Sequence, residues 1–232
     1  MKAAALELRR LECGSWSRPV SFQAVQGELV VLLGRNGSGK TTLLNTIAGL
    51  LRSVSGDIYI QGRRVNEMDC AERVRSGVHI ALEGRQLFGR LSVRRNLALG
   101  MFKSRRHQIE EDVTKILSIF PDLGDKLDER AAFLSGGQQT MVSVARALMG
   151  DPAIVLLDEP TLGLAPQNAQ RLIEALRSVC TERHITVLVA EQNGLIARAF
   201  PSHVIVLVGG EVSFEGSLTQ AASEGKLSQI FP

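Results

Sequence analysis

The sequence of 232 residues is poor in aromatic side chains, in cysteine and in long apolar runs. Aromatic residues make up 4% of it, so it offers few surfaces on which single-stranded nucleic-acid bases could stack. The three cysteines, Cys13, Cys70 and Cys180, form no Cys-x-x-Cys pair or Cys/His cluster, which argues against a disulfide framework or a zinc site and favours a reducing compartment. No run reaches the roughly 18 apolar residues of a membrane span, and the segment Met1–Glu7 places a charge too early for the apolar core of a signal peptide.

The charge balance is weak. With 27 Lys and Arg against 24 Asp and Glu, the formal net charge is +3, which gives little support to a nucleic-acid partner. Apolar residues make up 44%, a proportion typical of a soluble globular protein and sufficient for a sizeable core. The length fits one large domain or one domain with an inserted lobe.

Short apolar runs alternate with segments of helical periodicity. The runs at residues 29–33, 153–157, 185–190 and 204–208 are continuous, as in strands buried on both faces. This alternation predicts an α/β fold with a mostly parallel sheet covered by helices. Further predicted elements are a strand at residues 79–82, helices at 40–51 and from Pro166, a small antiparallel edge sheet at 3–10 and 20–25, and a hairpin at Gly209-Gly210.

Strand signals are absent between Ser92 and Gly150. Helical periodicity appears at residues 108–120 and 138–149 instead. We therefore predict an α/β core over residues 1–91 and 151–232, with a helical lobe inserted at residues 92–150.

A glycine-rich segment fits the phosphate-binding loop pattern G-x-x-x-x-G-K-[ST]. Its glycines let successive backbone N–H groups face a phosphate, and the positive end of the next helix favours the same anion. Lys40 would reach the outer phosphates of a nucleotide, and the Thr41 hydroxyl would hold Mg²⁺. The predicted cofactor-binding residues are Gly34, Arg35, Asn36, Gly37, Ser38, Gly39, Lys40, Thr41 and Thr42.

Two carboxylates end the apolar run at residues 153–157. Asp158 stands where phosphate-loop enzymes place an aspartate that helps to hold Mg²⁺. Glu159 stands where a general base could polarise the attacking water. Taken alone, the pair could equally be two solvated carboxylates at the end of a strand.

The segment Leu134-Ser135-Gly136-Gly137-Gln138, together with the phosphate loop and the two carboxylates, resembles the signature of ABC-transporter ATPases. The resemblance covers nearly the whole chain. It implies an α/β core, a helical lobe that carries the signature, and an antiparallel edge sheet. It also implies a head-to-tail pair in which Ser135, Gly136, Gly137 and Gln138 of one subunit cover ATP bound by the other.

Two further positions of the family pattern are altered here. The glutamine that senses Mg²⁺ and water is Glu83, and the switch histidine is Gln192. With the segment at residues 161–166, these departures resemble the branch that serves uptake of branched-chain amino acids, urea and amides. The resemblance implies that Glu83 assists catalysis and metal binding and that Gln192 hydrogen-bonds the terminal phosphate. The alternative for both Glu83 and Gln192 is that each is simply an exposed polar residue.

Two features stay open in the sequence. The family places an adenine-stacking aromatic residue upstream of the phosphate loop; Trp16 is the nearest candidate, but it lies closer to the loop than in the branch. From residue 84 to 109 there is no Asp or Glu, while basic residues are frequent. That stretch is either a solvated face or a surface near membrane subunits and anionic lipid. Its basic residues are Arg85, Arg90, Arg94, Arg95, Lys103, Arg105 and Arg106.

The resemblance implies an ATPase subunit of an importer for branched-chain amino acids or a similar small polar solute. We expect ATP and Mg²⁺ as cofactors, a second ATPase subunit and membrane permeases as partners, and a solute-binding protein as an indirect one. We expect no nucleic acid and a peripheral location on the cytoplasmic face of the membrane. The alternative is a soluble ABC ATPase of translation or DNA repair, but the former carries two ATPase units and the latter a long coiled coil, and neither is evident here.

Overall fold

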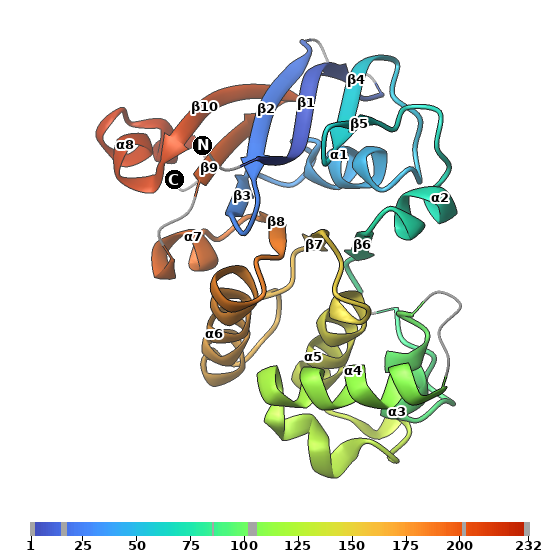
Figure 1. Cartoon of the computed structure of the whole chain (residues 1–232). Coiled ribbons are helices and arrows are strands. Elements are labelled where there is room, and N and C mark those ends of the chain that lie inside the picture. Colours follow the sequence, from blue (N-terminus) through green and yellow to red (C-terminus); the bar gives the residue numbers. More distant parts are fainter. Residues whose placement is uncertain (1–2, 15–17, 85, 102–105, 201–202, 230–232) are drawn as a thin grey trace.

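A computed structural model describes residues 3–14, 18–84, 86–101, 106–200 and 203–229 (Figure 1). The strands are β1 (Ala4–Glu12), β2 (Val20–Val25), β3 (Leu29–Leu33), β4 (Ser55–Ile60), β5 (Arg63–Arg64), β6 (Val78–Ala81), β7 (Ile154–Asp158), β8 (Thr186–Glu191), β9 (His203–Val208) and β10 (Glu211–Ser217). The α-helices are α1 (Lys40–Ile47), α2 (Cys70–Arg75), α3 (Val93–Ala98), α4 (Arg106–Ile119), α5 (Gly136–Leu148), α6 (Pro166–Glu182), α7 (Leu195–Ala199) and α8 (Leu218–Ser223). Short 3₁₀ turns are η1 (Pro121–Lys126), η2 (Ala131–Phe133) and η3 (Lys226–Gln229).

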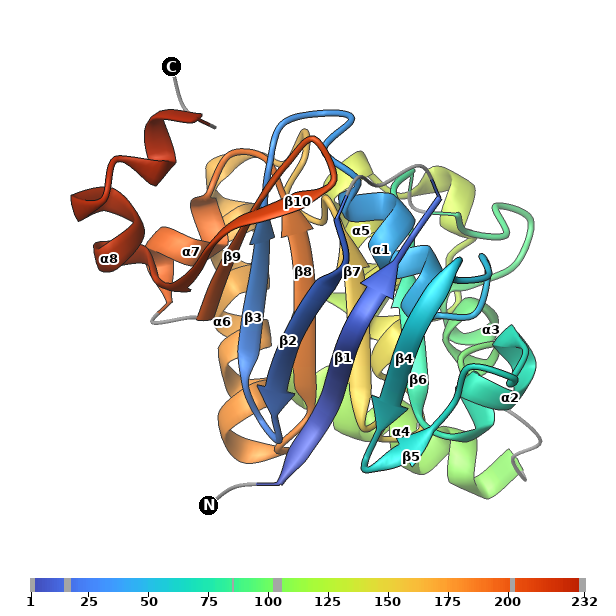
Figure 2. The same cartoon turned by 90° about the horizontal axis from the view of Figure 1, so that it is seen from above.

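These strands form two sheets. The larger has the order β10-β9-β3-β8-β7-β6, and its pairs are parallel except for β10 with β9. The smaller is antiparallel, with the order β2-β1-β4-β5. Figure 2 shows β1, β2 and β4 lying over the larger sheet. The predicted α/β fold, mostly parallel sheet and antiparallel edge sheet are confirmed.

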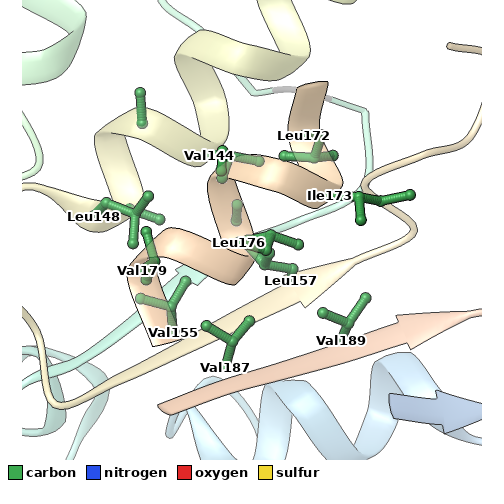
Figure 3. Packing of buried hydrophobic residues seen from close by; sticks show 14 of the residues in the cluster. Val144, Leu148, Val155, Leu157, Leu172, Ile173, Leu176, Val179, Val187 and Val189 are labelled. Atoms are coloured by element: carbon green, nitrogen blue, oxygen red, sulfur yellow. The ribbon is translucent and has the colours of Figure 1, made fainter. Parts of the chain in front are cut away.

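The central strands are buried along their whole length, because both faces of the larger sheet are covered. Alternate residues of β3 therefore enter different cores. Val31 joins the core under α5 and α6, whereas Val30 and Leu32 join the core under α1 and the smaller sheet. Figure 3 shows the first of these cores, with α5 and α6 packed on β7 and β8.

Helices and 3₁₀ turns occupy the described residues between Ser92 and Gly150, where α4 and α5 match the two predicted helices. Figure 1 shows α3, α4 and α5 gathered on one side of the sheets. An isolated bridge between Ser92 and Arg130 is the β-pairing that the structure records for this segment. The division of the chain into a core and a lobe stays a prediction.

The predicted helix at residues 40–51 is too long, because α1 ends at Ile47. Gly49 takes a left-handed φ of 77°, which breaks the helix. The buried guanidinium of Arg73 donates to the carbonyls of Thr46 and Ile47, at 2.6 and 2.8 Å. Since Arg73 is distant in sequence, periodicity around α1 gives no sign of this end. Elements that the sequence reasoning missed are β4, β5, α2, α3, α7 and α8.

No helix among the described residues combines the length and the apolar character that a membrane span requires.

Candidate active site

The loop between β3 and α1 surrounds a cavity of about 170 Å³ at the carboxyl edge of the larger sheet. Gly37 and Gly39 have φ of 79° and 99°, conformations that favour glycine. Gly34 is required for a different reason: a Cβ there would lie 2.3 Å from Ser38 Oγ and 2.7 Å from the carbonyl oxygen of Leu207. The lining residues are Asn36, Gly37, Ser38, Gly39, Lys40, Thr41, Thr42, Glu83 and Glu159.

Lys40 is the first residue of α1 and is only 5% exposed. Its ammonium donates to the carbonyl oxygen of Gly34 at 2.8 Å and lies 3.3 Å from Oε1 of Glu159. A buried cation needs such partners, because burial removes its hydration. The loop therefore fixes the Lys40 side chain in the lining of a cavity large enough for a phosphate group.

Asp158 ends β7 and is 3% exposed, yet neither carboxylate oxygen makes a hydrogen bond of normal geometry to a described residue. Burial raises its pKa, the Thr41 hydroxyl and Lys40 lower it, and the charge of Glu83 raises it further. An unpaired buried carboxylate is costly unless a ligand completes its shell.

The oxygen donors at this point fit Mg²⁺. Thr41, Asp158 and Glu83 offer one hydroxyl and two carboxylates, and Mg²⁺ prefers oxygen and usually shares its shell with phosphates and water. Within the described ranges no group of three or more His, Cys, Asp or Glu forms a metal cluster by itself. That composition fits an ion held jointly with a nucleotide.

Glu159 follows Asp158 in a left-handed conformation, with φ of 48°, which is uncommon for this residue type. Its backbone N–H donates to the Ala190 carbonyl at 2.9 Å, and its Oε2 accepts the backbone N–H of Gln192 at 3.2 Å. Burial raises the pKa of Glu159, and the neighbouring Lys40 lowers it. The carboxylate is thus held between the phosphate loop and the turn after β8.

A second cavity, of about 350 Å³, adjoins the first. Glu83 and Glu159 line both cavities, which places these carboxylates between them. Ser143 of α5 lines the second cavity with a buried Oγ that has no hydrogen-bond partner among the described residues. The sequence analysis missed Ser143; its only sequence signal is its place on the face of α5 that also carries Thr140 and Val144.

The Ser135 segment lies elsewhere. Ser135 caps α5: its Oγ accepts the N–H of Gln138 at 3.3 Å, and the Gln138 side chain accepts the N–H of Ser135 at 2.9 Å. Gly137 packs on α6, where an added Cβ would lie 2.3 Å from Nδ2 of Asn168. None of residues 135–138 lines either cavity described above.

The structure thus brings together the phosphate loop, Glu83, Asp158 and Glu159. Gln192 joins them through its backbone N–H, while its side chain is exposed. The Ser135 segment is not brought to the phosphate loop of the same chain. Trp16 lies outside the described residues.

A family model described as ABC transporter matches residues 17–162, more than half of the chain. The chain belongs to the ABC transporter family. Two curated relatives are similar over most of their length. The chain is 37% identical over 193 residues to the high-affinity branched-chain amino acid transport ATP-binding protein BraG of Pseudomonas aeruginosa, covering 83% of this chain and 82% of that protein. It is 36% identical over 218 residues to the phosphonates import ATP-binding protein PhnC 2 of Cupriavidus metallidurans, covering 89% and 77%.

Among solved structures, a dimeric ATP-binding cassette in a post-hydrolysis state with ADP and Pi is similar, with a TM-score of 0.79 and 26% identity. The match covers 92% of this chain and 98% of that cassette. These findings confirm the predicted family, the ABC ATPase fold and the enzyme class, because ATP-binding domains of ABC transporters are ATPases coupled to transport.

The basic stretch of this ABC ATPase is partly paired. Arg94 forms ion pairs with Glu110 and, at 3.7 Å, with Asp128, so it belongs to a compensated face. Arg90 and Arg95 are exposed. Arg85, Lys103 and Arg105 lie outside the described residues, and the side chain of Arg106 is not described.

Proposed function

We propose that the chain is the ATP-hydrolysing subunit of an importer for branched-chain amino acids or a similar small polar solute. The observation that carries the ATPase assignment is the meeting of Lys40 and Glu159, 3.3 Å apart, beside the unpaired carboxylate of Asp158. The altered residues Glu83 and Gln192 and the relative BraG favour branched-chain amino acids over phosphonates.

In the proposed mechanism, N–H groups of the phosphate loop bind the phosphates of ATP, and Lys40 turns from the Gly34 carbonyl to a phosphate oxygen. Thr41, Asp158 and Glu83 would hold Mg²⁺, which when bound would neutralise charge on the phosphates. Glu159 orients the attacking water and accepts its proton at Oε1, which lies 3.3 Å from the Lys40 ammonium and makes no hydrogen bond of normal geometry to a described residue. Gln192 and Glu83 stand beside that water as hydrogen-bonding groups.

The signature completes the site from a second ATPase subunit, either another copy or a related chain. The capping box of Ser135 and Gln138 keeps the first turn of α5 in place, and the positive end of that helix suits a terminal phosphate. Support comes from the separation of the Ser135 segment from both cavities and from the dimeric cassette among the structural relatives.

Membrane permeases are the proposed docking partners, with a solute-binding protein as an indirect partner and no nucleic acid. Phe88 and Leu99 are 58% and 54% exposed, and Arg95, four residues before Leu99, is exposed as well. The buried side chain of Asn96 ties the Phe88 segment to α3, by hydrogen bonds at 2.9 and 3.1 Å to the N–H and carbonyl of Phe88. A fixed, exposed apolar and basic surface of this kind suits a protein partner at the inner face of the membrane.

The cargo is tested by uptake in the source organism. Disrupting the coding sequence is expected to abolish uptake of labelled leucine and to spare uptake of methionine and methylphosphonate. Restoring the wild-type chain should recover leucine uptake, and restoring Glu159→Gln should not. Loss of phosphonate or methionine uptake with leucine uptake intact would replace the proposed cargo.

A further inference from the structure

Glu191 is a buried carboxylate to which the proposed mechanism gives no role. It is the last residue of β8 and is 0% exposed. In the sheet it lies opposite Leu33, the residue before the phosphate loop, and its neighbour Ala190 lies opposite Asp158. Glu191 therefore stands at the sheet edge between the phosphate loop and the catalytic carboxylates.

The Glu191 side chain is tied to the first turn of α7. Its Oε2 accepts the N–H of Ile196 at 3.2 Å, and its Oε1 accepts the N–H of Ala197 at 3.1 Å. The residue at the usual capping position is Gly194, which has no side chain to offer. Glu191 therefore caps α7 together with Asn193, whose Oδ1 accepts the N–H of Leu195 at 3.1 Å.

This turn is also the support of Glu159. The backbone N–H of Gln192, the residue after Glu191, donates to Oε2 of Glu159 at 3.2 Å. The other oxygen of Glu159 faces Lys40 at 3.3 Å. The direction of the Gln192 N–H follows from the turn at residues 192–194, which Glu191 and Asn193 tie to the first turn of α7.

We propose that Glu191 is a positioning residue for ATP hydrolysis: by fixing the turn at residues 192–194 it holds Glu159 in register with the phosphate loop. This inference rests on the role proposed for Glu159. An ionised carboxylate accepts both N–H groups of α7 and carries no donor, whereas a protonated carboxyl carries an O–H and is a weaker acceptor. Glutamine has the same shape but turns an NH₂ group toward one of those N–H groups.

The surroundings of Glu191 make the population of its ionised form depend on pH. Burial raises the pKa of Glu191 to about 7, the N–H groups of Ala197, Ile196 and Leu195 lower it, and Glu159 at the end of β7 raises it. Lys40 of α1 in turn lowers the pKa of Glu159, the charged neighbour of Glu191. The ordered turn should therefore depend on pH near neutrality.

The experiment compares Glu191→Gln with the wild type and with Glu182→Gln, a control at an exposed glutamate that ends α6. We measure single-turnover hydrolysis at saturating ATP and Mg²⁺, nucleotide affinity, and the unfolding temperature at pH 8. We expect the rate of Glu191→Gln to fall about tenfold, the scale of one net hydrogen bond. Nucleotide affinity should stay within about twofold and the unfolding temperature should not fall, because a buried charge is removed. The control should match the wild type.

The pH profile separates positioning from a structural role. The wild-type rate should fall as the pH drops through about 7, and Glu191→Gln should lack that limb. A Glu191→Gln rate within about twofold of wild type overturns the inference. So does a loss of rate that is matched by losses of affinity and stability.

Two further measurements keep the inference testable. In the wild type, the amide signals of Ile196 and Ala197 should shift together with a midpoint near pH 7; constant signals between pH 5.5 and 8.5 overturn the inference even if the variant does not fold. Glu159→Gln is measured alongside. If it is inactive while Glu191→Gln hydrolyses normally, only the inference about Glu191 fails; if Glu159→Gln is active, the proposed role of Glu159 fails too.

Discussion

The carboxyl edge of β7 and the first turn of α5 differ in whether their polar groups have hydrogen-bond partners within the fold. At the edge, the two oxygens of Asp158 and Oγ of Ser38 in the phosphate loop are buried and make no hydrogen bond of normal geometry to a described residue, and Oε1 of Glu159 faces Lys40 in an ion pair. At α5, Ser135 and Gln138 satisfy each other in a closed capping box. A fold keeps unpaired buried groups where a ligand completes them. We therefore expect the edge to be the half that changes when ATP binds and the α5 cap to be a preformed half.

The largest predicted effect lies at the edge. Glu159→Gln removes the group that accepts the proton of the attacking water but keeps the shape of the side chain. We expect hydrolysis to fall by about a hundredfold or more, with ATP affinity unchanged, by single-turnover kinetics and calorimetry. Glu182→Gln at the exposed end of α6 is the matched control. Near-normal turnover of Glu159→Gln would show that the edge does not supply the base.

The next prediction concerns the pH dependence of stability that the buried carboxyl of Glu191 gives to the same edge of the sheet. A carboxyl whose pKa is raised on folding makes the fold less stable as its charge forms, so this contribution is lost as pH rises from about 4.5 to about 7. Between pH 8 and pH 5 the wild type should gain about 2 to 3 kcal/mol more stability than Glu191→Gln. Urea unfolding of both proteins at the two pH values checks this. Equal gains would mean that Glu191 titrates at an ordinary value.

A smaller effect is expected at Gly34. The Cβ of Gly34→Ala would meet the backbone oxygen of Leu207 in β9, which cannot move aside as a side chain can. We expect a loss of about 1 to 3 kcal/mol in unfolding free energy, as in overpacked sites, and weaker ATP binding. Gly124→Ala is the control, since a Cβ there has no heavy atom within 4 Å. If Gly34→Ala and Gly124→Ala have the same unfolding free energy and the same ATP affinity, the phosphate loop does not approach β9 closely.

The smallest effect on stability belongs to the α5 cap. In Gly137→Ala the new Cβ meets the end of the Asn168 side chain, which can rotate away. We expect less than about 1 kcal/mol of lost stability, together with a clear loss of turnover if this cap covers ATP. Adding Asn168→Ala should restore the stability and not the turnover. Restored turnover would mean that Gly137 matters only for packing against α6.

The difference between the two regions also explains what could be predicted from the sequence. Continuous apolar runs in the sequence predict strands β3 and β7. The phosphate loop and the Ser135 cap are short local motifs, and the residue types in each indicate its chemistry. Strand β4 was missed because it begins Ser55-Gly56-Asp57 and is only half buried. Arg73 binds the carbonyls at the end of α1, and the proposed support of Glu159 runs through Glu191. The contacts of Arg73 and Glu191 join segments that are separate in the sequence or connected by a turn. Hydrophobic periodicity within one segment cannot predict such contacts.

The central claim is that the edge of one subunit and the α5 cap of another meet over one ATP. The most direct test measures ATP affinity and ATP-dependent dimerisation for Glu159→Gln and for Glu159→Gln combined with Ser135→Arg. We predict equal affinity by calorimetry and a dimer, seen by sedimentation, that only the single variant forms. A double variant that still dimerises with ATP, or a monomer that loses ATP affinity when Ser135 is replaced, would contradict the account.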